Sequence, residues 1–306
     1  MTKIAMAVVH GVGKQDPDFH RPLVSRIKER FAGKLQGLPN CPEHPELELV
    51  DEPVYWAPVL HQKESRLWDR VTSGFDLDYV KLRHFMIDFA ADAIAYQPLP
   101  NHRDIYDQIH VKFARALNRL AKPEAAGVKA PLCVIAHSLG TVIASNYLYD
   151  LDHDFQRKSK DGEQNCISEE VGNEIGDAPL EKGETLTLFF TMGSPIAIWS
   201  LRYERPLFGQ PIKVPARRLR RHYSKTKYPD LEGEWINIFD EDDVIGYPLK
   251  ALNSHYTKAV TKDLAVNAGG LLSSWNPLSH NSYWKDRDVI RCISDRLVST
   301  WKAVNP

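Results

Sequence analysis

Short apolar runs alternate along this chain with longer segments in which apolar residues recur every three or four positions. The runs cover residues 4–9, 47–56, 132–136, 185–192 and 235–239. Their near-continuous hydrophobicity is typical of parallel strands that helices cover on both faces. The pattern therefore predicts an α/β fold around a central, mostly parallel sheet.

Three of the longer segments have the spacing of amphipathic helices. One apolar stripe follows a possible cap at Asp76 or Asp78, a second ends before Lys122-Pro123, and a third lies near the carboxyl end. Because an apolar helical face normally packs on a core, we expect all three helices to face the sheet. The stripes are Tyr79, Leu82, Met86, Phe89 and Ala93; Ile105, Ile109, Phe113, Ala116 and Leu120; and Ile290, Ile293, Leu297 and Trp301.

Composition excludes several classes of protein. The 306 residues carry 39 Lys and Arg against 40 Asp and Glu, a balance that excludes a globally basic nucleic-acid binder. No apolar run is long enough to span a bilayer, and residues 1–10 lack the features of a signal peptide, so we expect a soluble cytoplasmic protein. The four cysteines form no C-x-x-C pair, which argues against a disulfide framework and a zinc site.

Two segments depart from the α/β pattern. Within an insertion over 154–184, residues 161–184 carry eight acidic side chains and one lysine, and we expect this stretch to be solvated. Residues 213–228 carry seven basic side chains and no acidic one. The basic run suits an anionic partner, a lipid headgroup or a substrate phosphate. The balanced total charge favours the simpler interpretation, a solvated segment.

The strongest local motif is Ala136-His-Ser-Leu-Gly140, between an apolar run and a segment with helical spacing. A serine at a tight strand-to-helix turn projects its hydroxyl above the sheet, and small residues two positions before and after it let strand and helix approach. Ala136 and Gly140 are those residues, so Ser138 is the candidate nucleophile. Here alanine replaces the first glycine of G-x-S-x-G, a sterically small change.

This motif resembles the nucleophile elbow of the lipase and esterase branch of the α/β-hydrolase fold. The resemblance implies one domain over 1–306 and a backbone oxyanion hole. The sequence His10-Gly11-Val12-Gly13-Lys14, directly after the first apolar run, is similar to the His-Gly motif of that family. The resemblance assigns the oxyanion donors to the N–H groups of Val12 and Leu139.

Gly11-Val12-Gly13-Lys14 also suggests a phosphate-binding loop. The Walker pattern would require glycine at Val8 and a hydroxyl residue at Gln15. Without that hydroxyl a magnesium ligand is missing, so nucleotide binding is not expected.

The acid and the base of a triad in this fold follow the serine in that order. Four carboxylates crowd the turn after the last predicted strand, and the sequence leaves Asp240, Asp242 and Asp243 open. Asn237, Asp243 and Tyr247 match a pattern of intracellular lipase-like hydrolases, and this resemblance favours Asp243. For the histidine, His280 lies before the terminal helix, and with the aromatic pair Tyr283-Trp284 it resembles the same hydrolases. Its competitor, His255, comes only twelve residues after Asp243, which leaves little room for the intervening helix.

The sequence thus predicts a carboxylic-ester hydrolase with Ser138, His280 and Asp243 as its triad and no metal or organic cofactor. The expected partner is a small ester with an apolar acyl or alcohol part, not a nucleic acid. Residues 196–234 form either a cap or lid or an ordinary long connection. A thioesterase, a peptidase, an acyltransferase and a catalytically silent binding protein remain alternatives. Five residues are expected to border the substrate: His10, Gly11, His137, Ser194 and Trp199. Of these, His10 suits a structural hydrogen-bonding role better than the role of a base. Ser194 does not sit in a nucleophile elbow.

Overall fold

The structure, a computed structural model, describes residues 1–74, 78–97, 102–156, 166–201, 228–268 and 279–306. Within these ranges, six strands form one sheet in the order β2-β1-β3-β4-β5-β6, and every neighbouring pair is parallel. The α/β class and the parallel sheet predicted from the sequence are confirmed. The strands are β1 (Ile4–Val9), β2 (Leu49–Val54), β3 (Leu132–His137), β4 (Leu186–Met192), β5 (Glu234–Asp240) and β6 (Lys262–Val266).

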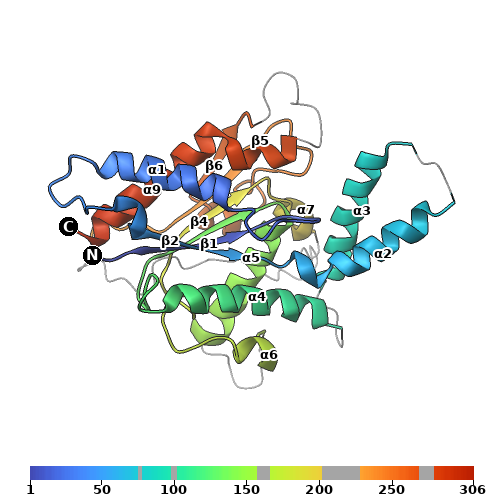
Figure 1. Cartoon of the computed structure of the whole chain (residues 1–306), viewed down its shortest axis with the longest axis horizontal. Helices are drawn as coiled ribbons and strands as arrows, with labels where there is room; N and C mark the ends of the chain where they lie inside the picture. Colours follow the sequence, from blue (N-terminus) through green and yellow to red (C-terminus); the bar gives the residue numbers. More distant parts are fainter. Residues whose placement is uncertain (75–77, 98–101, 157–165, 202–227, 269–278) are drawn as a thin grey trace.

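Helices cover both faces of the sheet (Figure 1). One core joins the sheet to α1 and α9, and the other joins it to α4 and α5. The two termini lie close together, and the Thr2 N–H donates to Asn305 Oδ1. The helices are α1 (Arg21–Leu35), α2 (His61–Thr72), α3 (Val80–Ala95), α4 (Asp104–Ala121), α5 (Leu139–Leu151), α6 (Glu169–Gly172), α7 (Ile196–Ser200), α8 (Ser254–Ala259) and α9 (Arg287–Val304).

Two sequence predictions about these elements are wrong. The strand over 235–239 is not the last one, because β6 follows it at the sheet edge; of its residues only Val266 is buried, so it lacks a continuous apolar run. The predicted helix around 79–93 exists as α3, but it does not face the core. Tyr79 and Met86 from its stripe are 78% and 51% exposed. Together α2 and α3 form a hairpin that projects away from the sheet (Figure 1).

The acidic insertion is only partly solvated where the structure describes it: Glu169, Glu170 and Asp177 are exposed, but other residues are buried. Over 166–184, Val171 and Leu180 are buried in the same core as α4 and α5. The buried Glu181 accepts the N–H groups of Gly176 and Ala178. Apolar residues between the acidic ones anchor the segment, a feature that a count of charges does not register.

Two further predictions concern residues largely outside the described ranges. Of the segment 196–234, the structure describes α7, residue 201 and residues 228–234; of the basic run 213–228, it describes Tyr228. Among the helices in the described ranges, none is both long and apolar enough to cross a membrane.

Candidate active site

Ser138 occupies a strained turn between β3 and α5. Its φ of 54° and ψ of −132° lie where side chains other than glycine are rare. Such strain persists when surrounding contacts hold the residue. Here the Ser138 N–H donates to the Met192 carbonyl, while the Ser138 carbonyl accepts from the backbone N–H and Oγ1 of Thr141. These contacts give Ser138 the sharp strand-to-helix geometry that the motif predicts.

Two glycines let the loop after β1 approach this turn. A Cβ atom on Gly11 would lie 2.6 Å from Ser138 Cβ, and one on Gly140 would overlap the His10 carbonyl oxygen. Larger side chains at either position would force the loop and the first turn of α5 apart. The glycines therefore let His10 and Gly11 lie directly against the Ser138 turn.

His280 and Asp243 meet at the same edge of the sheet. Asp243 follows β5, and His280 lies in a 3₁₀ helix over Ser279–Lys285, after β6. His280 Nδ1 donates to Asp243 Oδ2 at 2.9 Å, and both side chains are buried. Because a carboxylate accepts at Nδ1, the basic nitrogen of the neutral imidazole is Nε2.

Of the carboxylates that the sequence left open, Asp243 is the one in contact with His280. Asp240 is occupied elsewhere, since its oxygens accept the N–H groups of Asp242 and Ala268. Asp242 is exposed. The competing histidine, His255, lies on α8, and the described contacts join its side chain to neither Asp243 nor Ser138.

Sequence reasoning missed the structural roles of Tyr283 and Gly193. The Tyr283 hydroxyl donates to Asp243 Oδ2 at 2.8 Å and accepts the Asp240 N–H at 2.8 Å. Burial raises the pKa of Tyr283, and the Asp243 charge raises it further, so the phenol stays a donor. Gly193 has a φ of 54°, and a Cβ there would lie within 3.0 Å of Tyr283, Asp243 and His280.

The environment of Asp243 keeps it ionised. Burial alone would raise its pKa, but hydrogen bonds from His280, the Ile245 N–H and Tyr283 hold the pKa of Asp243 below its ordinary value. An ionised Asp243 can orient His280 and stabilise it when it becomes protonated.

His137 links the serine turn to the histidine loop. Its Nε2 donates to the His280 carbonyl at 2.6 Å, and the two rings lie 4.8 Å apart. Burial lowers the pKa of His137 to about 3, so the ring is a neutral donor near pH 7. In this structure His137 positions the chain at His280, whereas the sequence analysis placed it against the substrate.

Ser138 and His280 are not hydrogen-bonded to each other here. Ser138 Oγ is buried and has no hydrogen-bond partner in the described part of the chain. Hydrogen bonds between catalytic groups are often long or absent in unliganded active sites, so this arrangement is compatible with a triad.

His10 and Ser194 have structural roles. His10 Nδ1 donates to the Gly11 carbonyl, while Nε2 accepts the N–H groups of Trp56 and Ala57. Burial lowers the pKa of His10 to about 3. The Ser194 hydroxyl pairs with Thr141 Oγ1 at 2.7 Å and so supports the serine turn. Both side chains are fully buried. Burial agrees with the structural role expected for His10. It also means that neither side chain is exposed to border a substrate.

The predicted oxyanion donors both lie beside Ser138. Val12 follows Gly11, which contacts the serine, and Leu139 is the first residue of α5. Neither N–H donates to another backbone or side-chain group among the described residues. The next N–H, that of Gly13, donates to Asp92 Oδ2 on α3 at 3.0 Å. The ring of Trp199 on α7 contacts the ring of Phe89 on α3 in an edge-to-face arrangement.

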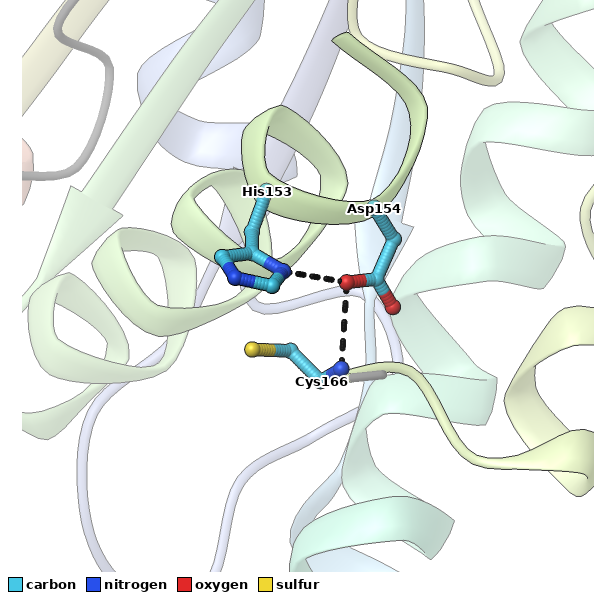
Figure 2. Close-up of side chains that lie close together, drawn as sticks. All are labelled: His153, Asp154 and Cys166. Carbon is cyan, nitrogen blue, oxygen red and sulfur yellow. Dashed lines mark hydrogen bonds and ion pairs between the residues drawn. The ribbon is translucent and has the colours of Figure 1, made fainter. Parts of the chain in front are cut away.

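A second cluster of polar side chains lies apart from this site, where His153, Asp154 and Cys166 come together (Figure 2). Asp154 accepts from His153 Nδ1 and from the N–H groups of Cys166 and Ile167. The Asp154 carboxylate thus connects Cys166 and Ile167 to the π-helical turn Asp152–Gln156. This network explains the cluster as a structural link.

Comparisons with protein-family models, with curated proteins and with solved structures find no match.

Proposed function

We propose that this protein is a serine hydrolase of the α/β-hydrolase fold that cleaves carboxylic esters. The observation that carries the proposal is the strained Ser138 turn, together with the buried His280–Asp243 pair that His137 connects to it. Residues 138, 243 and 280 follow β3, β5 and β6, so the parallel sheet supports all three from one edge. Their order along the chain is that of α/β-hydrolase triads.

The proposed mechanism assigns one step to each group. Ser138 Oγ attacks the ester carbonyl while His280 Nε2 takes its proton, and the N–H groups of Val12 and Leu139 stabilise the oxyanion. Asp243 holds His280 in the Nδ1–H tautomer. The protonated His280 then donates its proton to the leaving alcohol. Water, activated by the same histidine, releases the acid from the acyl-enzyme.

Access to Ser138 is part of the proposal. Ser138 is 0% exposed and His280 is 2% exposed, so an ester reaches them after the chain around the site opens.

Activity-based labelling tests the nucleophile and the reaction class together. We expect a fluorophosphonate to modify Ser138 and nitrophenyl esters to be hydrolysed. Ser138→Ala and His280→Ala should each lower turnover by several powers of ten, and His255→Ala should leave it near wild type. Absence of both labelling and hydrolysis would favour a binding protein on this fold. Faster turnover of thioesters or amides, or transfer to an added alcohol, would assign a different acyl-transfer reaction.

A further inference from the structure

Helix α3 exposes large apolar side chains and directs its carboxylates inward. Its exposed side chains include Val80, Met86 and Ile94, which are 51%, 51% and 74% exposed. Its carboxylates face inward: Asp92 is 1% exposed and accepts the Gly13 N–H, and Asp88 also lies at Gly13. A helix in contact with water on its outer face normally has the opposite arrangement. The outer face of α3, which also carries the exposed Arg83, therefore combines apolar side chains with one basic side chain.

Helix α2 continues this surface and adds positive charge. Leu67 and Val71, one turn apart, are 42% and 45% exposed. At 100° per residue, Lys63, Arg66 and Arg70 occupy the arc beside that apolar strip, and all three are exposed. An exposed apolar strip bordered by basic side chains is typical of helices that lie in a membrane interface, where long basic side chains reach the headgroups.

The neighbouring elements extend the apolar surface around the candidate active site. Ile198 and Leu201 are exposed at α7, whose Trp199 contacts α3. Val244 is 67% exposed beside Asp243. Most of the large hydrophobic side chains that the described residues expose therefore lie at the carboxyl edge of the sheet or on the α2–α3 hairpin.

We propose that the α2–α3 hairpin, residues 61–74 and 78–95, binds the surface of an anionic lipid bilayer. Its apolar side chains would enter the interface while Lys63, Arg66 and Arg70 contact anionic headgroups. A second copy of the chain is a poorer fit, because a two-fold interface with its axis at α2 would bring the basic residues of both copies close together. The inference goes beyond the proposed function, since lipid binding requires no ester hydrolysis.

Co-sedimentation with ether-linked vesicles tests the inference without offering an ester to hydrolyse. We expect the protein to bind vesicles of equimolar ether-linked phosphatidylcholine and phosphatidylglycerol and to bind phosphatidylcholine alone far more weakly. Val71→Glu and Met86→Glu should each weaken binding by about tenfold. Arg70→Ala should weaken it by about fivefold, as expected for one basic residue near an anionic surface.

Val128→Glu is the matched control. Val128 is 45% exposed, as Val71 is, but it lies in the turn before β3, at the opposite edge of the sheet. We expect this variant to bind like the wild type, and circular dichroism should show all variants folded. The proposal is overturned if anionic vesicles do not bind, or if Val71→Glu and Val128→Glu bind equally. It is also overturned if light scattering shows a dimer that Val71→Glu dissociates while vesicle binding is absent.

Discussion

Gly193 offers a stringent test of the site geometry, because one added methyl group would meet three of its residues. In Gly193→Ala, the new Cβ would lie 2.8 Å from Tyr283 Cε2, 2.9 Å from Asp243 Oδ2 and 3.0 Å from His280 Cε1. The positive φ costs an alanine about 1–2 kcal/mol, and overpacking adds about 1–3 kcal/mol. We expect the free energy of unfolding to fall by about 2–5 kcal/mol. Displacement of His280 should lower turnover by about 100-fold.

Gly37→Ala separates the two contributions. Gly37 also has a positive φ, 85°, but no atom lies within 4 Å of a Cβ built there. It should therefore lose only the backbone part, about 1–2 kcal/mol, with normal turnover. Urea unfolding at equal m-values, together with ester hydrolysis, measures both effects. Equal stability losses for the two variants, with turnover retained in Gly193→Ala, would refute the close packing of Gly193 against Tyr283, Asp243 and His280.

Two further predictions concern Tyr283 and Asp92. Tyr283→Phe removes a donor from Asp243 and leaves the Asp240 N–H unpaired, so it should cost about 1.5–3 kcal/mol of stability and raise the pKa of Asp243. The acid limb of the activity profile should then move to higher pH, and an unchanged limb would contradict the role of Tyr283. Burial and the neighbouring Glu64 raise the pKa of Asp92 from 3.8 to about 9. Between these pH values the folded protein retains a proton that the unfolded chain releases. The free energy of unfolding should therefore fall as the pH rises from about 4 to about 9. Asp92→Asn, which keeps an acceptor for Gly13, should flatten that dependence in urea titrations, whereas identical slopes would contradict the buried protonated carboxyl.

The sequence predicted those parts of the fold that long buried runs define. β1, β3 and β4 are buried along their whole lengths, so their apolar runs stand out from the flanking segments. β6 is largely accessible at the sheet edge and leaves no such pattern. Periodicity located α3 but assigned it to the core, because spacing shows that a helix has distinct faces and not which face points inward.

In the candidate site, too, residues that a local motif defines could be predicted, whereas residues brought together from distant parts of the chain could not. The Ser138 turn depends on five adjacent residues, so a local motif indicates it. Gly193 owes its importance to Asp243 and Tyr283, which lie 50 and 90 residues further along the chain, and such an approach has no local pattern. The choice of Asp243 over Asp240 likewise depends on backbone N–H groups that occupy Asp240 once the chain has folded.

The α2–α3 hairpin connects the two proposals physically. Asp92 bonds the N–H of Gly13, next to the proposed oxyanion donor Val12, while Phe89 contacts Trp199. The inner face of α3 therefore contacts the loop beside Ser138, and its outer face is the proposed lipid-binding surface. A shift of α3 at a membrane would act on Gly13 through one hydrogen bond from a buried carboxyl. That contact needs an acceptor rather than a charge, so Asp92→Asn should preserve it and Asp92→Ala should remove it. The turnover of the two variants, compared with and without vesicles, measures how strongly the hairpin controls the loop that carries Val12 and Gly13.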